Sequence, residues 1–320
     1  IQSNLDVVDI YFENAHEHIS YSKNMPASNL VETANYCFAF TNEFSFYVLF
    51  DPITNSLISM NEPSTSSALI VKQFDTIIPG MIFNLDRISS FVKAKGIKSF
   101  TIYEISMIIF TNSMNELFRQ IYEQRNLSFN ITLLSFEQAQ KCEQSFKTES
   151  FISDLTHDEK TTFLFTLLSS GKNALVSPDL QQLAVNTMKA PDDITKLEMT
   201  KVFLMYIPFS THIILFKLVQ IYGGGYMDQE NRNKAITILT ETIFRRFIDR
   251  DIEREFISFM FLFYQYLFPS EKNTDSKSKI CVYDKKLVLF DILFDQQIHA
   301  FTTDGPTDIT IEQTTPLDHN

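Results

Sequence analysis

Tryptophan is absent from this chain of 320 residues, and glycine is scarce, with seven residues. Phenylalanine, in contrast, occurs 31 times, and hydrophobic residues make up 44% of the sequence. Few glycines together with many large apolar side chains favour packed helices over a turn-rich β architecture. The length and the hydrophobic share also suffice for a full core. We therefore expect a globular, mainly helical protein.

Long hydrophobic runs and an excess of positive charge are also missing. The longest apolar stretch, residues 256–268, has about 13 residues, fewer than the roughly 20 that cross a bilayer as a helix. We expect this stretch to be a buried helix, and no transmembrane segment is predicted. The net charge of −12 would repel nucleic acid and anionic lipid, so neither is expected as a partner.

Cysteine is rare and shows no paired spacing, because Cys37, Cys142 and Cys281 lie far apart. An odd number of isolated cysteines is typical of free thiols in a reducing compartment, so we expect a cytoplasmic protein. The chain has neither an initial methionine nor a signal-like segment, and we expect it to be part of a longer protein.

Motifs for phosphate binding and hydrolysis are missing as well. No glycine-rich loop ends in Gly-Lys-Ser or Gly-Lys-Thr. The glycines at 223–225 follow a helical pattern, which is typical of a helix end rather than of a phosphate-binding loop. No pair of carboxylates can be assigned to acid and base roles. No cofactor is therefore expected.

Two histidines, His16 and His18, are two residues apart and would share one face of a strand. Two imidazoles on one face can bind a metal ion when further ligands are close. The sequence identifies no third ligand near them. We therefore interpret them as a solvent-exposed pair and predict no metal site.

Residues 1–74 differ from the rest of the chain and are predicted to form a small N-terminal module that contains strands. Residues 46–60 alternate in polarity around turn signals at Asp51-Pro52 and Asn55-Ser56, which predicts two strands joined by a turn. The polar residues 61–67 are predicted to form a loop or linker that closes the module.

From residue 78 the hydrophobic period changes from about 2 to about 3.6, which predicts a helical domain over residues 75–302. A disordered polar tail is predicted over 303–320. Capping-box patterns begin at Ser113 and Thr156, and Ser177-Pro178 and Asp192 are further start signals. The predicted helices cover residues 81–92, 113–122, 156–171, 177–188, 192–206, 210–222, 233–268 and 285–301.

Three segments of the chain carry a further pattern. The first runs from Ile78-Pro79 to Gly96-Ile97 and continues with Phe100-Thr-Ile-Tyr-Glu-Ile-Ser106. The second covers residues 163–180, and the third runs from Ile207-Pro208 through His212 to Asn233-Lys234. In this order the three segments resemble a RhoGAP domain, the GTPase-activating domain for Rho-family GTPases. The resemblance implies an all-α, RhoGAP-like helical bundle after the N-terminal segment.

The resemblance also implies where polar contacts to a GTPase would lie. This chain has Glu104 at the position of the family's catalytic arginine. At the positions of a lysine, an arginine and an asparagine it has Phe165, Ser169 and Leu239. Residues 244–246 read Phe-Arg-Arg where the family has Phe-Gly-Pro. The implied GTPase-binding surface consists of Glu104, Phe165, Ser169, Lys172, Asn233, Lys234 and Leu239.

These departures lead to three hypotheses. The first is a non-catalytic RhoGAP-like module, a pseudo-GAP that binds a Rho-family GTPase or serves as a scaffold in signal transduction. The missing arginine supplies about 10³ to 10⁵ in rate in such activators, so little activation is expected. The second is an active GTPase-activating protein that takes its arginine from another segment, with Arg119 and Arg125 the nearest. The third is a helical adaptor without a GTPase partner.

Overall fold

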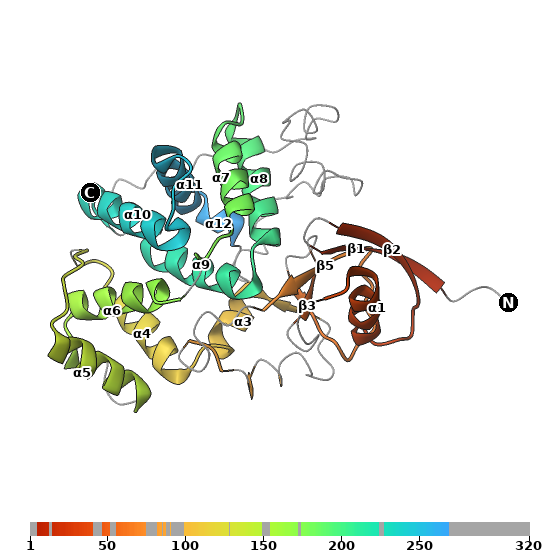
Figure 1. Ribbon diagram of the computed structural model, residues 1–320, viewed down its shortest axis with the longest axis horizontal. Helices are drawn as coiled ribbons and strands as arrows, with labels where there is room; N and C mark the ends of the chain where they lie inside the picture. The colour runs from red at the N-terminus through yellow and green to blue at the C-terminus, as the bar shows by residue number, and fades with distance from the viewer. Residues whose placement is uncertain are drawn as a thin grey trace, which may run out of the picture.

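A six-stranded sheet packs against a set of helices in the computed structural model (Figure 1). The structure describes residues 5–12, 15–40, 47–51, 56–74, 82–84, 86–87, 90, 99–127, 129–148, 154–171, 174–223 and 227–268. More of these residues lie in helices than in strands, which confirms a mainly helical chain with an N-terminal sheet. Within these ranges, every helix is too short or too polar to cross a bilayer.

The sheet has the strand order β2-β1-β5-β3-β4-β6. Strands β1 and β5 are parallel, and the other neighbouring strands are antiparallel. Helix α1, Ser28–Phe38, covers one face, where Leu30 and Val31 lie in one buried cluster with Val8 and Ile10. The strands are β1 Leu5–Phe12, β2 Ala15–Ser22, β3 Tyr47–Asp51, β4 Ser56–Ile58, β5 Ala68–Gln73 and β6 Ser99–Thr101.

The two strands predicted in residues 46–60 are confirmed as β3 and β4, which form an antiparallel pair. The sequence did not predict β1, β2 or β5. Strand β5 follows the predicted loop, and it pairs with β1, which places Ala68 opposite Asp9. Strand β6 lies beyond the predicted boundary at residue 74 and pairs with β4. The sheet thus takes strands from both sides of residue 74. The division into two domains at that residue stays a prediction.

The helices account for most of the described chain after β6. Of the predicted helix over 81–92, only a few residues are described, and the predicted helix over 285–301 and tail over 303–320 lie outside the described residues. The helices are α3 Ile102–Ile108, α4 Asn112–Glu123, α5 Phe136–Lys147, α6 His157–Ser169, α7 Pro178–Met188, α8 Asp193–Tyr206, α9 Phe209–Tyr222, α10 Gln229–Phe244, α11 Arg250–Leu262 and α12 Tyr264–Leu267.

Several helix starts follow the local signals in the sequence. Thr156 and Glu159 form the predicted capping box of α6, and Asp192 caps α8. The start predicted at Ser113 is wrong. Thr111 is the N-cap of α4, while the Ser113 hydroxyl donates to a buried backbone carbonyl. Threonine and serine both serve as N-cap residues. Thr111 caps α4 here, because the Ser113 hydroxyl is already bonded to the Phe146 carbonyl.

Two further features differ from the prediction. The predicted helix over 233–268 is interrupted, since α10 ends at Phe244 and α11 begins at Arg250. Helix α5 was not predicted, although Ser135 and Gln138 form a capping box at its start. Helix α5 contains few apolar residues, so hydrophobic periodicity predicts it only weakly, whereas the capping box marks its start clearly.

Helix α9 forms the centre of the helical part. Thirteen of its fourteen residues are buried, including polar residues such as Thr211 and Lys217. A helix that is buried on all sides lies inside the protein rather than at its surface. The same hydrophobic core also contains Tyr11 and Phe50 of the sheet, so sheet and helices share one interior.

A buried lysine joins the sheet to this interior. Lys72 of β5 is 3% exposed, and its Nζ atom donates to the Leu204 carbonyl of α8 at 2.7 Å. In a regular helix that carbonyl would accept from the residue four positions on, which is Pro208 and has no N–H. The Lys72 Nζ atom also lies 3.1 Å from Nδ1 of His212. Lys72 therefore satisfies a carbonyl that Pro208 leaves without its helical partner.

We predict that acid destabilises the fold through His212. Burial and the neighbouring Lys72 lower the pKa of His212 well below its ordinary value. The unfolded chain therefore binds a proton near pH 6.5 that the folded chain does not, and the free energy of unfolding falls as the pH falls. Replacing His212 with Phe should remove about 1 to 1.5 kcal/mol of the loss between about pH 7.5 and pH 5.5. Urea denaturation at the two pH values tests this, and an unchanged pH dependence would contradict it.

Candidate partner-binding surface

Glu104 lies in the first turn of α3 and helps to form the start of that helix. Its Oε2 atom accepts hydrogen bonds from the Thr101 backbone N–H at 2.7 Å and from the Thr101 hydroxyl at 3.0 Å. The Thr101 hydroxyl oxygen accepts from the Glu104 N–H in return, which completes a capping box. The Glu104 carboxylate is thus hydrogen-bonded within the cap of its own helix.

Phe165 and Leu239 do not lie on a surface. They are 4% and 1% exposed, and both belong to the main hydrophobic core. The Phe165 ring packs edge-on against Phe129 and in a tilted contact with Tyr222. Neither side chain is available to a partner in this structure, so their assignment to the GTPase-binding surface was wrong.

Ser169 is exposed at the C-terminal end of α6, where Arg245 binds the free carbonyls. The Arg245 guanidinium donates to the carbonyls of Ser169 at 2.8 Å, Gly171 at 2.5 Å and Leu168 at 3.3 Å. The last carbonyls of a helix have no partner within it, and a cation there also interacts favourably with the helix dipole. Arg245 has a positive φ of 55°, so it ends α10 while it caps α6.

The remaining predicted residues do not form one patch with Ser169. Asn233 and Lys234 lie exposed near the start of α10, whereas Arg245, which binds the Ser169 carbonyl, follows the other end. A helix rises about 1.5 Å per residue, so the positions of Asn233 and Arg245 are about 18 Å apart along it. Lys172 lies outside the described residues.

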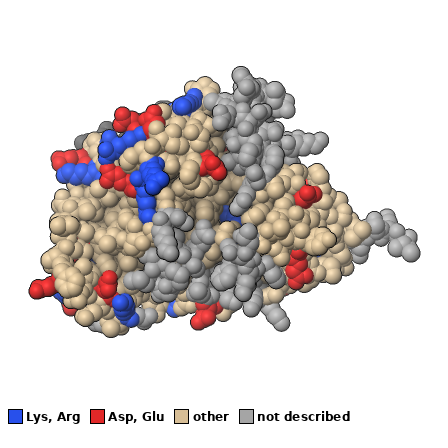
Figure 2. Space-filling view, in the orientation of Figure 1, with Lys and Arg blue, Asp and Glu red and all other residues tan. Residues whose placement is uncertain are grey.

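Asn233 and Lys234 line a groove between α10 and α11 with a volume of about 350 Å³. The Lys234 ammonium lies 2.8 Å from the Glu230 carboxylate. Among the described residues, Nε of Arg254 is buried without a hydrogen-bond partner. In Figure 2 positive and negative side chains alternate over the part of the surface where α10 and α11 lie. The groove is lined by Glu230, Asn233, Lys234, Thr237, Ile238 and Arg254.

The two arginines considered as replacements for the catalytic one are held by their own helix or its end. The Arg119 guanidinium donates to the carboxylates of Glu116 and Glu123 at 2.5 Å each. The Arg125 guanidinium stacks over the Tyr122 ring at 3.9 Å from its centroid and donates to the Tyr122 carbonyl. Both would have to leave these contacts to reach a bound nucleotide.

Comparisons with known proteins give one structural similarity. No protein-family model and no curated protein matches the sequence. Among solved structures, the BH domain from Graf, the GTPase regulator associated with focal adhesion kinase, is similar at a TM-score of 0.40 and 9% identity. The match covers 50% of this chain and 96% of that domain.

We predict that Glu104 contributes to stability through the capping box. Glu104→Ala removes the acceptor for the Thr101 N–H and should lower the free energy of unfolding by about 0.3 to 1.5 kcal/mol. Glu104→Gln retains an acceptor of the kind found in capping boxes and should have a smaller effect. Chemical denaturation of both variants measures the difference. An equal loss of unfolding free energy in the two variants would show that the negative charge of Glu104, and not its hydrogen bond to Thr101, stabilises the fold.

Proposed function

We propose that this chain is a RhoGAP-like module that binds a Rho-family GTPase without accelerating GTP hydrolysis. The observation that carries the proposal is Glu104, which takes the position of the family's arginine and is held in a helix cap. The order of the three similar segments supports the family, and among the described residues helices α3, α6 and α9 lie within them or overlap them. No cofactor and no nucleic acid are part of the proposal, and we place the protein in the cytoplasm.

Replacing an arginine finger with a glutamate would lower the rate of GTP hydrolysis. An arginine finger supplies about 10³ to 10⁵ in rate because it neutralises charge that develops on the phosphates. A carboxylate 4 Å from a phosphate would be repelled by about 4 kcal/mol per unit of phosphate charge at an effective dielectric constant near 20. At two further positions of the match, Phe165 and Leu239 are buried and supply no polar group to a partner. The replacement at Glu104 thus argues against catalysis, while helices are retained over the matched segments.

The groove between α10 and α11 is the surface that we propose for the partner. It retains two polar positions from the family match, Asn233 and Lys234, and Arg254 adds a second cation. Ile238 supplies an apolar contact beside these charges. A groove of this kind suits a protein segment that offers a carboxylate beside an apolar side chain, since charge pairs give orientation and apolar contacts give affinity.

We predict that the full chain does not activate hydrolysis. Single-turnover GTP hydrolysis by Rho-family GTPases should rise by less than about twofold in its presence, because no arginine finger acts on the phosphates. A known GTPase-activating protein serves as the positive control for each GTPase. Acceleration by orders of magnitude would contradict the proposal. Loss of that activity in Arg119→Ala or Arg125→Ala would then favour an arginine from another segment.

We predict that Lys234→Glu weakens binding of a GTP-loaded Rho protein roughly tenfold or more, because it reverses a charge inside the groove. Lys147→Glu is the matched control, since Lys147 is also an exposed lysine paired with a glutamate one turn earlier, Glu143. Calorimetry with GTP-loaded and GDP-loaded proteins measures both variants. An equal loss of affinity in Lys234→Glu and Lys147→Glu would show that the partner does not bind in the groove between α10 and α11. Failure of every Rho protein to bind the unaltered chain would favour the adaptor without a GTPase partner.

A further inference from the structure

We propose that Asp9, His16 and His18 form a binding site for a divalent transition-metal ion of the zinc type. The three residues lie on the β1–β2 hairpin, away from the groove between α10 and α11. Each offers one ligand atom, and these atoms lie within 4.8 Å of one another. The inference does not depend on the proposed binding of a GTPase.

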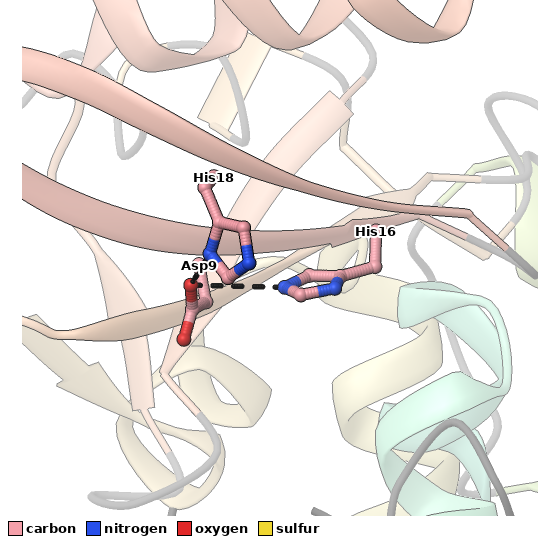
Figure 3. Close-up of side chains that lie close together, drawn as sticks. All are labelled: Asp9, His16 and His18. Carbon is pink, nitrogen blue, oxygen red and sulfur yellow. Dashed lines mark hydrogen bonds and ion pairs between the residues drawn. The ribbon is translucent and has the colours of Figure 1, made fainter. Parts of the chain in front are cut away.

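The strand register brings the three side chains to one face of the hairpin. Strand β1 pairs with β2 so that Asp9 lies opposite His18 and Tyr11 lies opposite His16. Residues two apart on a strand point to the same side, and paired residues on antiparallel strands also share a side. The sequence suggested no third ligand for the two histidines, because Asp9 reaches them only through this pairing. Figure 3 shows both imidazole rings turned toward the Asp9 carboxylate.

The distances suit a metal site after small side-chain movements. Oδ1 of Asp9 lies 3.7 Å from Nε2 of His16 and is hydrogen-bonded to Nδ1 of His18. Tetrahedral zinc with bonds of about 2.0 to 2.2 Å places its ligand atoms roughly 3.3 Å apart. Rotations about the side-chain bonds, which shift these atoms by about 1 Å, would reach that geometry.

A second observation points to a missing ligand at His16. Its Nε2 atom is buried and has no hydrogen-bond partner among the described residues. The distance of 3.7 Å to Asp9 is too long for a hydrogen bond. The ring is held in place by stacking on Tyr11, with centroids 4.5 Å apart and planes at 11°. A buried nitrogen without a partner is costly, and a metal ion between His16 and Asp9 would satisfy it.

The chemistry of the ligands selects the kind of ion. Two imidazole nitrogens and one carboxylate suit zinc and similar transition metals, whereas calcium and magnesium prefer sites made of oxygen. Three protein ligands leave a coordination position for water or for a group from a partner. The side chain of His18 is 69% exposed, so an ion can reach the site from solvent. Strand β2 is an edge strand, and a bound ion would fix it to β1.

Calorimetric titration of the full chain, freed of metal by a chelator, with ZnCl₂ tests the proposal. We expect one ion per chain, an unfolding temperature that rises with zinc, and visible absorption by Co²⁺ in the same site. Asp9→Asn and His18→Ala should each weaken zinc binding at least tenfold. His18 is exposed and Asp9→Asn is conservative, so circular dichroism should show both variants folded.

Control variants remove potential ligands elsewhere in the chain, and we choose His157→Ala, Cys37→Ser and the double change of His299 and His319 to Ala. These should leave zinc affinity unchanged. The proposal is overturned if the unaltered chain binds no zinc, or if Asp9→Asn and His18→Ala bind zinc as tightly as the unaltered chain. Loss of binding only in one of the control variants would assign the ion to a different site and would overturn it equally.

Discussion

The hydrogen bond from Lys72 to the end of α8 joins the sheet to the helices at a point where the backbone needs a polar partner. Pro208 lets the chain turn from α8 into the buried helix α9, but it withdraws the N–H that the Leu204 carbonyl would otherwise bind. Apolar contacts can hold the two layers together, yet they cannot satisfy a buried carbonyl. A lysine from β5 does so, and His212 and the Phe50 ring surround its Nζ atom. The arrangement explains how a fully buried lysine can persist in the core.

Charged side chains elsewhere act in a related way, at the ends of helices. Glu104 accepts hydrogen bonds at the start of α3, and the Arg245 guanidinium donates to the last carbonyls of α6. Negative charge at a helix start and positive charge at a helix end are both favourable to the helix dipole. These charges therefore stabilise the fold whether or not a nucleotide is present.

The sequence predicts features that depend on near neighbours and misses those that depend on distant ones. Most helix starts were readable, because a cap involves residues three apart. Strand β5 was not, since it pairs with β1 across almost 60 residues, from Ala68 to Asp9. Strands β1 and β2 were missed although they form a local hairpin that closes from Phe12 to Ala15. The same limit applies to the candidate sites. Asp9 joins His16 and His18 only through strand register, and the burial of Phe165 and Leu239 follows from tertiary packing that the sequence resemblance does not contain. The capping box of Glu104 was local and could have been predicted.

The burial of Phe165 and Leu239 shows what these two positions contribute to the fold. Burying a large apolar side chain stabilises a protein by about 1.5 to 3 kcal/mol, whereas a lysine or asparagine at the same depth would need a partner for its polar group. Asn233 and Lys234, in contrast, are exposed in the groove between α10 and α11 and contribute little to the core. Substitutions in this groove can therefore change a surface contact with little effect on stability, whereas polar substitutions at Phe165 or Leu239 would destabilise the core.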